Sequence, residues 1–357
     1  MELGIIRFPQ SGKTTLFNAL TRGNVPTGIS GGKMAIHTAV VDVPDRRLGV
    51  LAGMFQPQKV VHAKVTYADI AGLDEKISET GISGPLLNTL SQMDGFIHVV
   101  RHYTNPMVPH FSGSVDPERD LTRLETELIL NDLIIVERKL ERLEQERQRG
   151  GFGRDKSQFA RDVELFEKLQ GLLSEERPLR DVAFSEDEQK ILSSYGLLSL
   201  KPQLIVVNQS EDQQPIELPT PYASTMQICM PAKLEMDIAQ LPPEEAAVFL
   251  EEYEIQEPSL DRFIKLSYEL LGLLSFFTYG EKEVHAWTLP RGATALEAAG
   301  AIHSDMEKGF IRAEVIAFED LEALGSIAEA RNQGKLRLEG KKYIVQDGDV
   351  ITIRFNI

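Results

Sequence analysis

Short apolar runs that end in polar or turn residues recur along the chain. Runs of about four to eight residues with this boundary are typical of buried strands. The candidates are Leu3–Ile6, Lys64–Ala68, Gly95–Val100 and Gln203–Val207. Helical segments separate these runs, beginning with Thr15–Leu20 after the first one. This alternation predicts a parallel α/β sheet, in which ligands bind at the carboxyl ends of the strands.

The segment between the third and fourth predicted strands changes to helical spacing. Apolar residues recur every three or four positions over Ile129–Leu143, among many charged residues, and again over Phe159–Leu173. Glycines within 150–153 interrupt the two stretches. The pattern predicts an antiparallel helical hairpin inserted into the α/β domain. Its mixed charges are typical of a solvated face, so the pattern alone favours a structural role over partner binding.

From about Tyr279 the pattern changes again, to short strand-like pieces around one helix, Ala295–Ile302. The predicted strands are Glu283–Trp287, Ala313–Ala317, Tyr343–Val345 and Val350–Phe355. This composition is typical of a small α+β module. The resulting domain boundaries are 1–118 and 199–278 for the α/β domain, 119–198 for the helical insertion and 279–357 for the C-terminal module.

Composition and charge narrow the class of protein. A chain of 357 residues that is 42% hydrophobic and 26% charged fits a globular protein of several domains. Its 54 acidic and 38 basic residues give a formal charge of -16, which disfavours whole-molecule attraction to nucleic acid or to an anionic membrane, although a local basic face could still bind RNA. The single cysteine, Cys229, excludes an internal disulfide and a cysteine-based zinc cluster. The absence of a long apolar run predicts a cytoplasmic protein without a membrane span.

The strongest chemical signal lies between the first predicted strand and the first predicted helix. Gly12-Lys13-Thr14 has the pattern of a phosphate-binding loop, in which backbone N–H groups, a lysine and a metal-binding hydroxyl meet a nucleotide. Lys13 would contact the terminal phosphates and Thr14 would ligate Mg²⁺. Arg7 occupies the position of the first glycine in G-x-x-x-x-G-K-[ST], so it either changes the loop or adds a cation beside the nucleotide. The expected nucleotide-binding residues of this loop are Gln10, Ser11, Gly12, Lys13, Thr14 and Thr15.

Two further motifs follow predicted strands in the order expected of a P-loop GTPase. Asp69 to Gly72 has the form D-x-x-G, in which Asp69 could hold Mg²⁺ through water and the Gly72 N–H could meet a terminal phosphate. Asn208 to Glu211 stands where guanine-specific proteins have N-K-x-D, whose aspartate accepts hydrogen bonds from the guanine edge. Because Glu211 replaces that aspartate, the sequence disfavours strict guanine selectivity.

With these motifs the chain resembles the YchF/Obg-like ATPase family, a branch of the P-loop GTPases, over essentially its whole length. The most specific stretches are Gly280–Thr288, Ala299–His303, Gly309–Val315 and Leu338–Asp349. The resemblance implies a P-loop G domain with an inserted coiled-coil domain and a C-terminal TGS-type domain. It also implies Mg²⁺ as cofactor, ATP in preference to GTP, and a ribosome or ribosomal subunit as partner, with RNA as a further candidate.

The resemblance also implies a catalytic loop histidine. In the family a hydrophobic residue follows D-x-x-G, as Leu73 does here, and hydrolysis is attributed to a histidine that matches His110. A neutral imidazole could orient the attacking water near neutral pH. The chain departs from the family at Lys33, which stands where a switch threonine would ligate Mg²⁺, and at Pro231–Lys233, which replaces a base-contacting Ser-Ala element.

These observations leave open two main functions and one variant. The first is a slow Mg-ATP hydrolase whose nucleotide state regulates docking on the ribosome. The second is a catalytically weak or inactive nucleotide-binding module with the same partners. Arg7 and Lys33 favour the second, whereas Lys13, Asp69 and His110 favour the first. A GTPase is the variant, and the sequence leaves the oligomeric state open.

Overall fold

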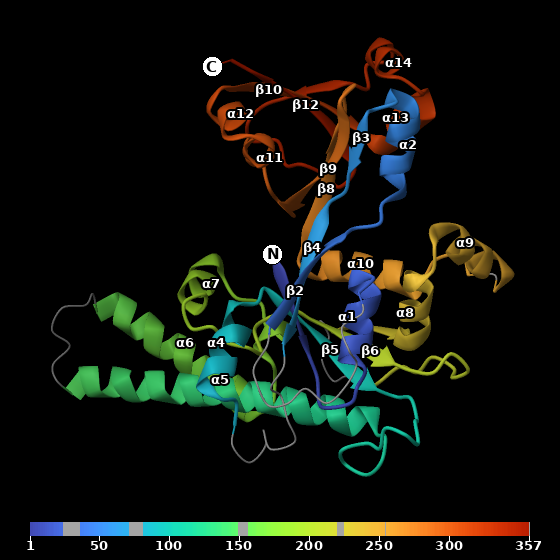
Figure 1. Cartoon of the computed structure of the whole chain (residues 1–357). Helices are drawn as coiled ribbons and strands as arrows, with labels where there is room; N and C mark the ends of the chain where they lie inside the picture. Colours follow the sequence, from blue (N-terminus) through green and yellow to red (C-terminus); the bar gives the residue numbers. More distant parts are fainter. Residues whose placement is uncertain (24–35, 71–80, 149–155, 220–224, 254, 357) are drawn as a thin grey trace. The chain divides into compact units, whose positions relative to one another are not determined.

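The computed structural model describes residues 1–23, 36–70, 81–148, 156–219, 225–253 and 255–356 (Figure 1). The chain divides into two compact units. Unit 1 comprises Met1–Ala39 and Thr66–Leu260, and unit 2 comprises Val40–Val65 and Asp261–Ile357. The helical insertion is not separated from the rest of unit 1 by this division, so the boundaries at 118, 198 and 278 stay predictions. The grouping of residues 40–65 with the C-terminal part was not expected from the sequence.

A largely parallel sheet forms the centre of unit 1, and β2 and β4 continue across the division between the units. In spatial order its strands are β2 (Ile36–Asp42), β4 (Lys64–Ile70), β1 (Glu2–Ile6), β5 (Gly95–Arg101), β6 (Gln203–Asn208) and β7 (Met226–Met230). The pairs from β4 to β7 are parallel. Every residue of β5 and β6 is buried, because helices cover both faces of such a sheet, and this is why these strands read as continuous apolar runs. The predicted parallel α/β class is confirmed.

Helices surround this sheet, and two of them form the predicted hairpin. Those of unit 1 are α1 (Lys13–Thr21), α4 (Gly84–Gln92), α5 (Pro117–Gln148), α6 (Lys156–Ser174), η1 (Leu179–Asp181), α7 (Glu186–Leu192), α8 (Ala232–Gln240) and α9 (Pro243–Glu252), and α10 (Ser259–Leu270) begins there. The long helix α5 lies beside α6, and Val136, Phe166 and Leu169 belong to one buried cluster between them (Figure 1). None of the described helices is long and apolar enough to cross a membrane.

Polar side chains tie α5 to the chain that enters β6. The carboxylate of Asp132 accepts hydrogen bonds from the backbone N–H groups of Leu198 and Ser199, at 2.8 and 2.7 Å. Burial raises the pKa of Asp132 to about 6. Nearby, Glu125 of α5 forms a buried ion pair with Arg180 of η1 at 2.7 Å. Helix α5 is therefore fixed to the segments that lead into β6 by directional contacts as well as by its apolar stripe.

Unit 2 is built on a mixed sheet. Its strands, in spatial order, are β11 (Arg337–Glu339), β10 (Phe310–Ala317), β12 (Asp349–Phe355), β8 (Leu273–Thr278), β9 (Glu283–Pro290) and β3 (Lys59–Val61). Its helices are α2 (Arg46–Phe55), α11 (Ala295–Ile302), α12 (Ser304–Lys308), α13 (Phe318–Leu324) and α14 (Ile327–Asn332). The predicted helix 295–302 is confirmed, and Thr294 and Glu297 close it with a capping box. The predicted strand Tyr343–Val345 is wrong: it makes only an isolated bridge, from Ile344 to Thr294.

Two contacts explain why residues 40–65 belong to unit 2. Strand β3 pairs in parallel with β9. Arg47 at the start of α2 binds Asp45 and Asp347, each at 2.8 Å, and its guanidinium lies over the ring of Phe277. These partners are distant from Arg47 in sequence, except for Asp45, so local periodicity does not indicate them.

Candidate functional site

The loop between β1 and α1 has a backbone that exposes the start of the helix. Gly12, which precedes α1, has φ 90° and ψ 18°, and Gln10 has φ 62°. Gly12 is the N-cap residue of α1 and has no side chain that could cap the first turn. Helix N-termini carry free N–H groups and a partial positive charge, so an uncapped one favours an anionic ligand.

Buried polar atoms around this loop lack protein partners. Ser11 is 3% exposed, and its hydroxyl has no hydrogen-bond partner within the part of the chain that the structure describes. The same is true of the Oε1 atom of Gln10 and the Nε atom of Arg7. Buried polar groups in native proteins are nearly always paired, so three such atoms at one loop indicate the place of a polar ligand.

A buried charge cluster lies beside the loop. Lys13 forms an ion pair with Asp69 at the end of β4, and its amine also donates a hydrogen bond to the Ile70 carbonyl at 2.5 Å. Burial lowers the pKa of Lys13 to about 8; Asp69 opposes this shift and Arg7 adds to it. Burial likewise lowers the pKa of Arg7, and Asp69 opposes it. Arg7 therefore adds a second cation beside one carboxylate, which leaves the cluster with an excess of positive charge.

Asn208 connects the loop to the start of α8. Its Nδ2 atom donates to the Ser11 carbonyl at 2.9 Å, and its Oδ1 atom accepts from the backbone N–H of Ala232 at 3.1 Å. A Cβ atom on Gly12 would lie 2.1 Å from Nδ2 of Asn208. Glycine is thus required at position 12 by both φ and space. Beyond Asn208, Glu211 is exposed on a loop closed by the Ser210 N–H, which donates to Gln213 Oε1 at 2.7 Å.

The candidate metal ligands are both neighbours of Lys13: Thr14 follows it in the chain, and Asp69 is its ion-pair partner. Thr14 is the second residue of α1 and is partly exposed, and Asp69 is buried at the end of β4. Among the described residues, no group of three or more His, Cys, Asp or Glu side chains could hold a metal. Mg²⁺ bound together with phosphates needs only one or two protein carboxylates, so a hydroxyl and one carboxylate fit this ion. Thr15 is also partly exposed in the first turn, whereas Gly72, Leu73 and Lys33 lie outside the described residues.

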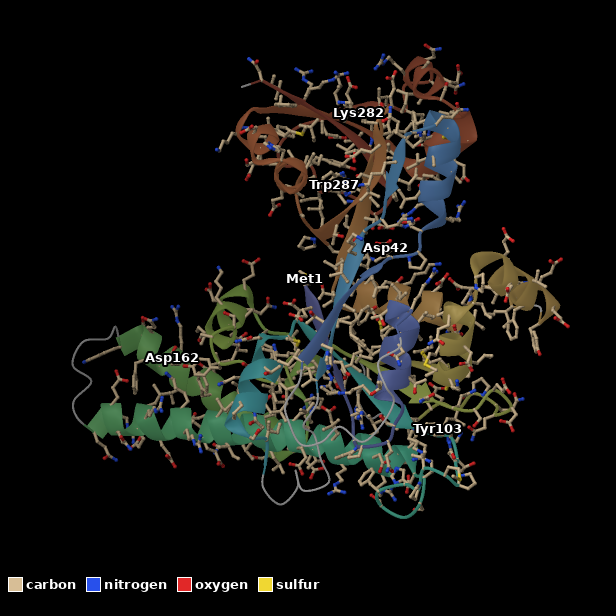
Figure 2. All side chains as sticks on the ribbon, in the orientation of Figure 1. Met1, Asp42, Tyr103, Asp162, Lys282 and Trp287 are labelled. Atoms are coloured by element: carbon tan, nitrogen blue, oxygen red, sulfur yellow. The ribbon has the colours of Figure 1, made fainter. Side chains whose placement is uncertain are left out.

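Two residues that were given no role in the sequence analysis, Tyr103 and Arg101, support the loop between β1 and α1. Tyr103, labelled in Figure 2, donates from its hydroxyl to the Gln10 carbonyl at 2.9 Å. Arg101, at the end of β5, donates to the carbonyls of Val108 at 2.7 Å and Tyr103 at 3.1 Å, and its guanidinium lies 4.4 Å from the centre of the Tyr103 ring. A buried arginine at the carboxyl end of an apolar strand is the signal that could have indicated this role.

His110 is buried near the loop and held by α5. Its Nε2 atom lies 2.8 Å from Oδ2 of Asp120, and its Nδ1 atom accepts a hydrogen bond from the Ser112 N–H at 3.1 Å. A cavity of about 10 Å³, room for about one water molecule, is lined by both Ser11 and His110. Burial lowers the pKa of His110, with Asp120 opposing the shift, so the neutral imidazole is favoured.

Comparisons with known proteins place this geometry in context. Residues 273–356 match the family model YchF-GTPase_C, described as "Protein of unknown function (DUF933)". The "Ribosome-binding ATPase YchF" of Bacillus subtilis (strain 168) is 42% identical over the full length of both chains. Its namesake from Pasteurella multocida (strain Pm70) is 39% identical over 100% of this chain and 99% of that protein. The structure titled "Structure of the Schizosaccharomyces pombe YchF GTPase" superposes with a TM-score of 0.86 at 31% identity, covering 99% of this chain and 97% of that one.

Proposed function

The chain belongs to the YchF family of nucleotide hydrolases, and on this premise we propose that it binds Mg-ATP at the loop around Lys13 and hydrolyses it slowly. The observation that carries the proposal is the buried Ser11 hydroxyl, which has no hydrogen-bond partner among the described residues, next to the N-terminus of α1, whose N-cap residue is a glycine. Both features favour phosphate oxygens as the missing acceptors.

The loop residues have distinct parts in this proposal. Backbone N–H groups from Gly12 to Thr15 and the Ser11 hydroxyl would donate to phosphate oxygens. Lys13 would exchange Asp69 for a terminal phosphate, because the phosphate carries more negative charge than one carboxylate. Arg7 would offset further negative charge from beside the loop. The departure at Arg7 is therefore compatible with nucleotide binding.

Thr14 and Asp69 are the residues that would hold Mg²⁺. Their hydroxyl and carboxylate oxygens are hard donors of the kind that this ion prefers. When bound, Mg²⁺ bridges phosphate oxygens and neutralises the charge that develops on them during transfer. Asp69 would become available for this role once Lys13 has moved to the phosphates.

ATP is proposed as the preferred nucleotide because Glu211 replaces the aspartate of the guanine-specific motif. The names of similar proteins differ on this point, since the Bacillus subtilis protein is called an ATPase and the Schizosaccharomyces pombe protein a GTPase. Asn208 supports the site mainly as the link between the loop and α8. Base selection would then depend on the exposed loop that contains Glu211.

We further propose that the nucleotide state regulates association with the ribosome. This proposal is supported by the names of the full-length relatives, which are called ribosome-binding ATPases. The chain's formal charge of -16 opposes a broad electrostatic attraction to ribosomal RNA. Docking therefore requires specific contacts rather than overall charge.

Calorimetric titration with non-hydrolysable ATP and GTP analogues, each with and without Mg²⁺, tests the proposal. We expect tighter binding of the ATP analogue, strengthened by Mg²⁺, and loss of binding in Lys13→Ala. Lys190→Ala is the matched control, because Lys190 is an exposed lysine of α7. Tighter binding of the GTP analogue would favour a GTPase. If neither analogue binds at sub-millimolar concentration, the proposal fails, and any association with the ribosome would be independent of nucleotide.

A further inference from the structure

Both ring nitrogens of His110 lie against a polar group: Nδ1 accepts a hydrogen bond from the Ser112 N–H, and Nε2 makes a close contact with the Asp120 carboxylate that lacks hydrogen-bond geometry. Nδ1 accepts the Ser112 N–H, so it carries no proton. In the neutral ring Nε2 then carries the proton, and it lies 2.8 Å from Oδ2 of Asp120. Neither nitrogen is free to accept a hydrogen bond from a water molecule. In this arrangement neither nitrogen can accept a proton from a water molecule, so His110 cannot act as a base.

Asp120 is itself fixed at the start of α5. Its other oxygen, Oδ1, accepts from Nε and Nη2 of Arg119 at 2.9 and 2.8 Å. Arg119 also donates to the Ser114 carbonyl at 3.0 Å, which ties the loop after His110 to the helix. The Asp120 carboxylate thus uses one oxygen for Arg119 and the other for His110. The charge-assisted hydrogen bonds from Arg119 are stronger than neutral ones, so they fix the carboxylate in place.

In this arrangement His110 lies close to the proposed phosphate site. His110 and Ser11 line the same small cavity. The centre of the Phe111 ring lies 4.5 Å from the centre of the His110 ring and 5.2 Å from the centre of the ring of Phe8, which belongs to the loop between β1 and α1. A change in the contact with Asp120 would therefore take place next to the nucleotide rather than at a remote surface.

We propose that Asp120 is a positioning residue that holds His110 in a resting arrangement, and that this contact must break before His110 assists hydrolysis. The inference rests on the proposed nucleotide hydrolysis and adds a restraint to it. Because Asp120 belongs to α5, a partner that displaces the start of this helix would release the ring. The restraint connects the helical insertion to the nucleotide loop through one side-chain contact.

Chemical modification of His110 tests the contact without requiring hydrolysis. Diethyl pyrocarbonate reacts with an accessible neutral imidazole, and mass spectrometry measures the rate at His110. We expect Asp120→Ala to be modified about tenfold faster than the wild type, since a contact with a charged group is lost. Asp120→Asn retains an acceptor oxygen and should give an intermediate rate. Glu118→Ala is the matched control, because Glu118 is an exposed carboxylate in the same first turn of α5.

Steady-state hydrolysis tests the effect of the contact on turnover. We expect kcat to rise in Asp120→Ala with KM unchanged, and the rise to be absent in the double variant His110→Ala/Asp120→Ala. An unchanged modification rate in both Asp120 variants would overturn the proposal. So would faster modification without any rise in kcat in a protein that hydrolyses nucleotide. If the wild type binds nucleotide but hydrolyses none, the proposed activity fails, and the modification rate alone decides whether Asp120 holds the ring.

Discussion

Replacing Gly12 by alanine tests the link between the nucleotide loop and Asn208. The substitution places a Cβ atom at a residue with φ 90° and 2.1 Å from Nδ2 of Asn208. Two costs follow. The left-handed backbone costs an alanine about 1–2 kcal/mol. Displacement of Asn208 would lose its hydrogen bonds to the Ser11 carbonyl and the Ala232 N–H, at about 1 kcal/mol each.

The expected destabilisation of Gly12→Ala is therefore about 3–4 kcal/mol. Urea unfolding followed by far-ultraviolet circular dichroism measures it, and the fluorescence of Trp287, the single tryptophan of the sequence, identifies the transition of unit 2. Gly171→Ala in α6 is the matched control. A Cβ atom at Gly171 would meet no atom within 4 Å, so this helical substitution should stabilise the protein by about 0.5–1 kcal/mol.

A double-mutant cycle separates the collision from the backbone strain. Asn208→Ala removes the atom that Cβ of residue 12 would meet. The double variant Gly12→Ala/Asn208→Ala should consequently be more stable than the sum of the single effects by about 1–2 kcal/mol. Additivity to within about 0.5 kcal/mol would refute the collision, and the stability loss of Gly12→Ala would then come from φ alone.

Two further outcomes follow from buried charges. Since burial lowers the pKa of Lys13 to about 8, the amine is charged below that pH, and nucleotide affinity should weaken as the pH rises above it, by up to about tenfold per pH unit. Titrations at about pH 7 and about pH 9 check this, and the always charged Lys13→Arg should show no such loss. Glu125→Ala should destabilise the protein by about 3–5 kcal/mol because Arg180 loses its ion-pair partner in a buried site, and a loss below about 1 kcal/mol in equilibrium unfolding would contradict this.

The sequence by itself determined the elements that carry a local signal. The strands β5 and β6 are continuous apolar runs because both faces of the sheet are covered, and α5 and α6 repeat apolar residues every three or four positions because one face of each is buried. The loop that we propose to bind nucleotide could also be found from the sequence, because Gly12-Lys13-Thr14 is contiguous. The structure and the full-length relatives confirm the fold class and the family that these signals predicted.

Only the tertiary structure decided which distant residues meet. Asn208 bridges the Ser11 carbonyl and the Ala232 N–H, and no local pattern indicates those partners. The spacing of His110 and Asp120 does not show that the ring contacts the carboxylate. The grouping of β3 with unit 2 likewise depends on its pairing with β9. Such contacts follow from how the whole core packs and how strands align, which the periodicity of a single segment does not contain.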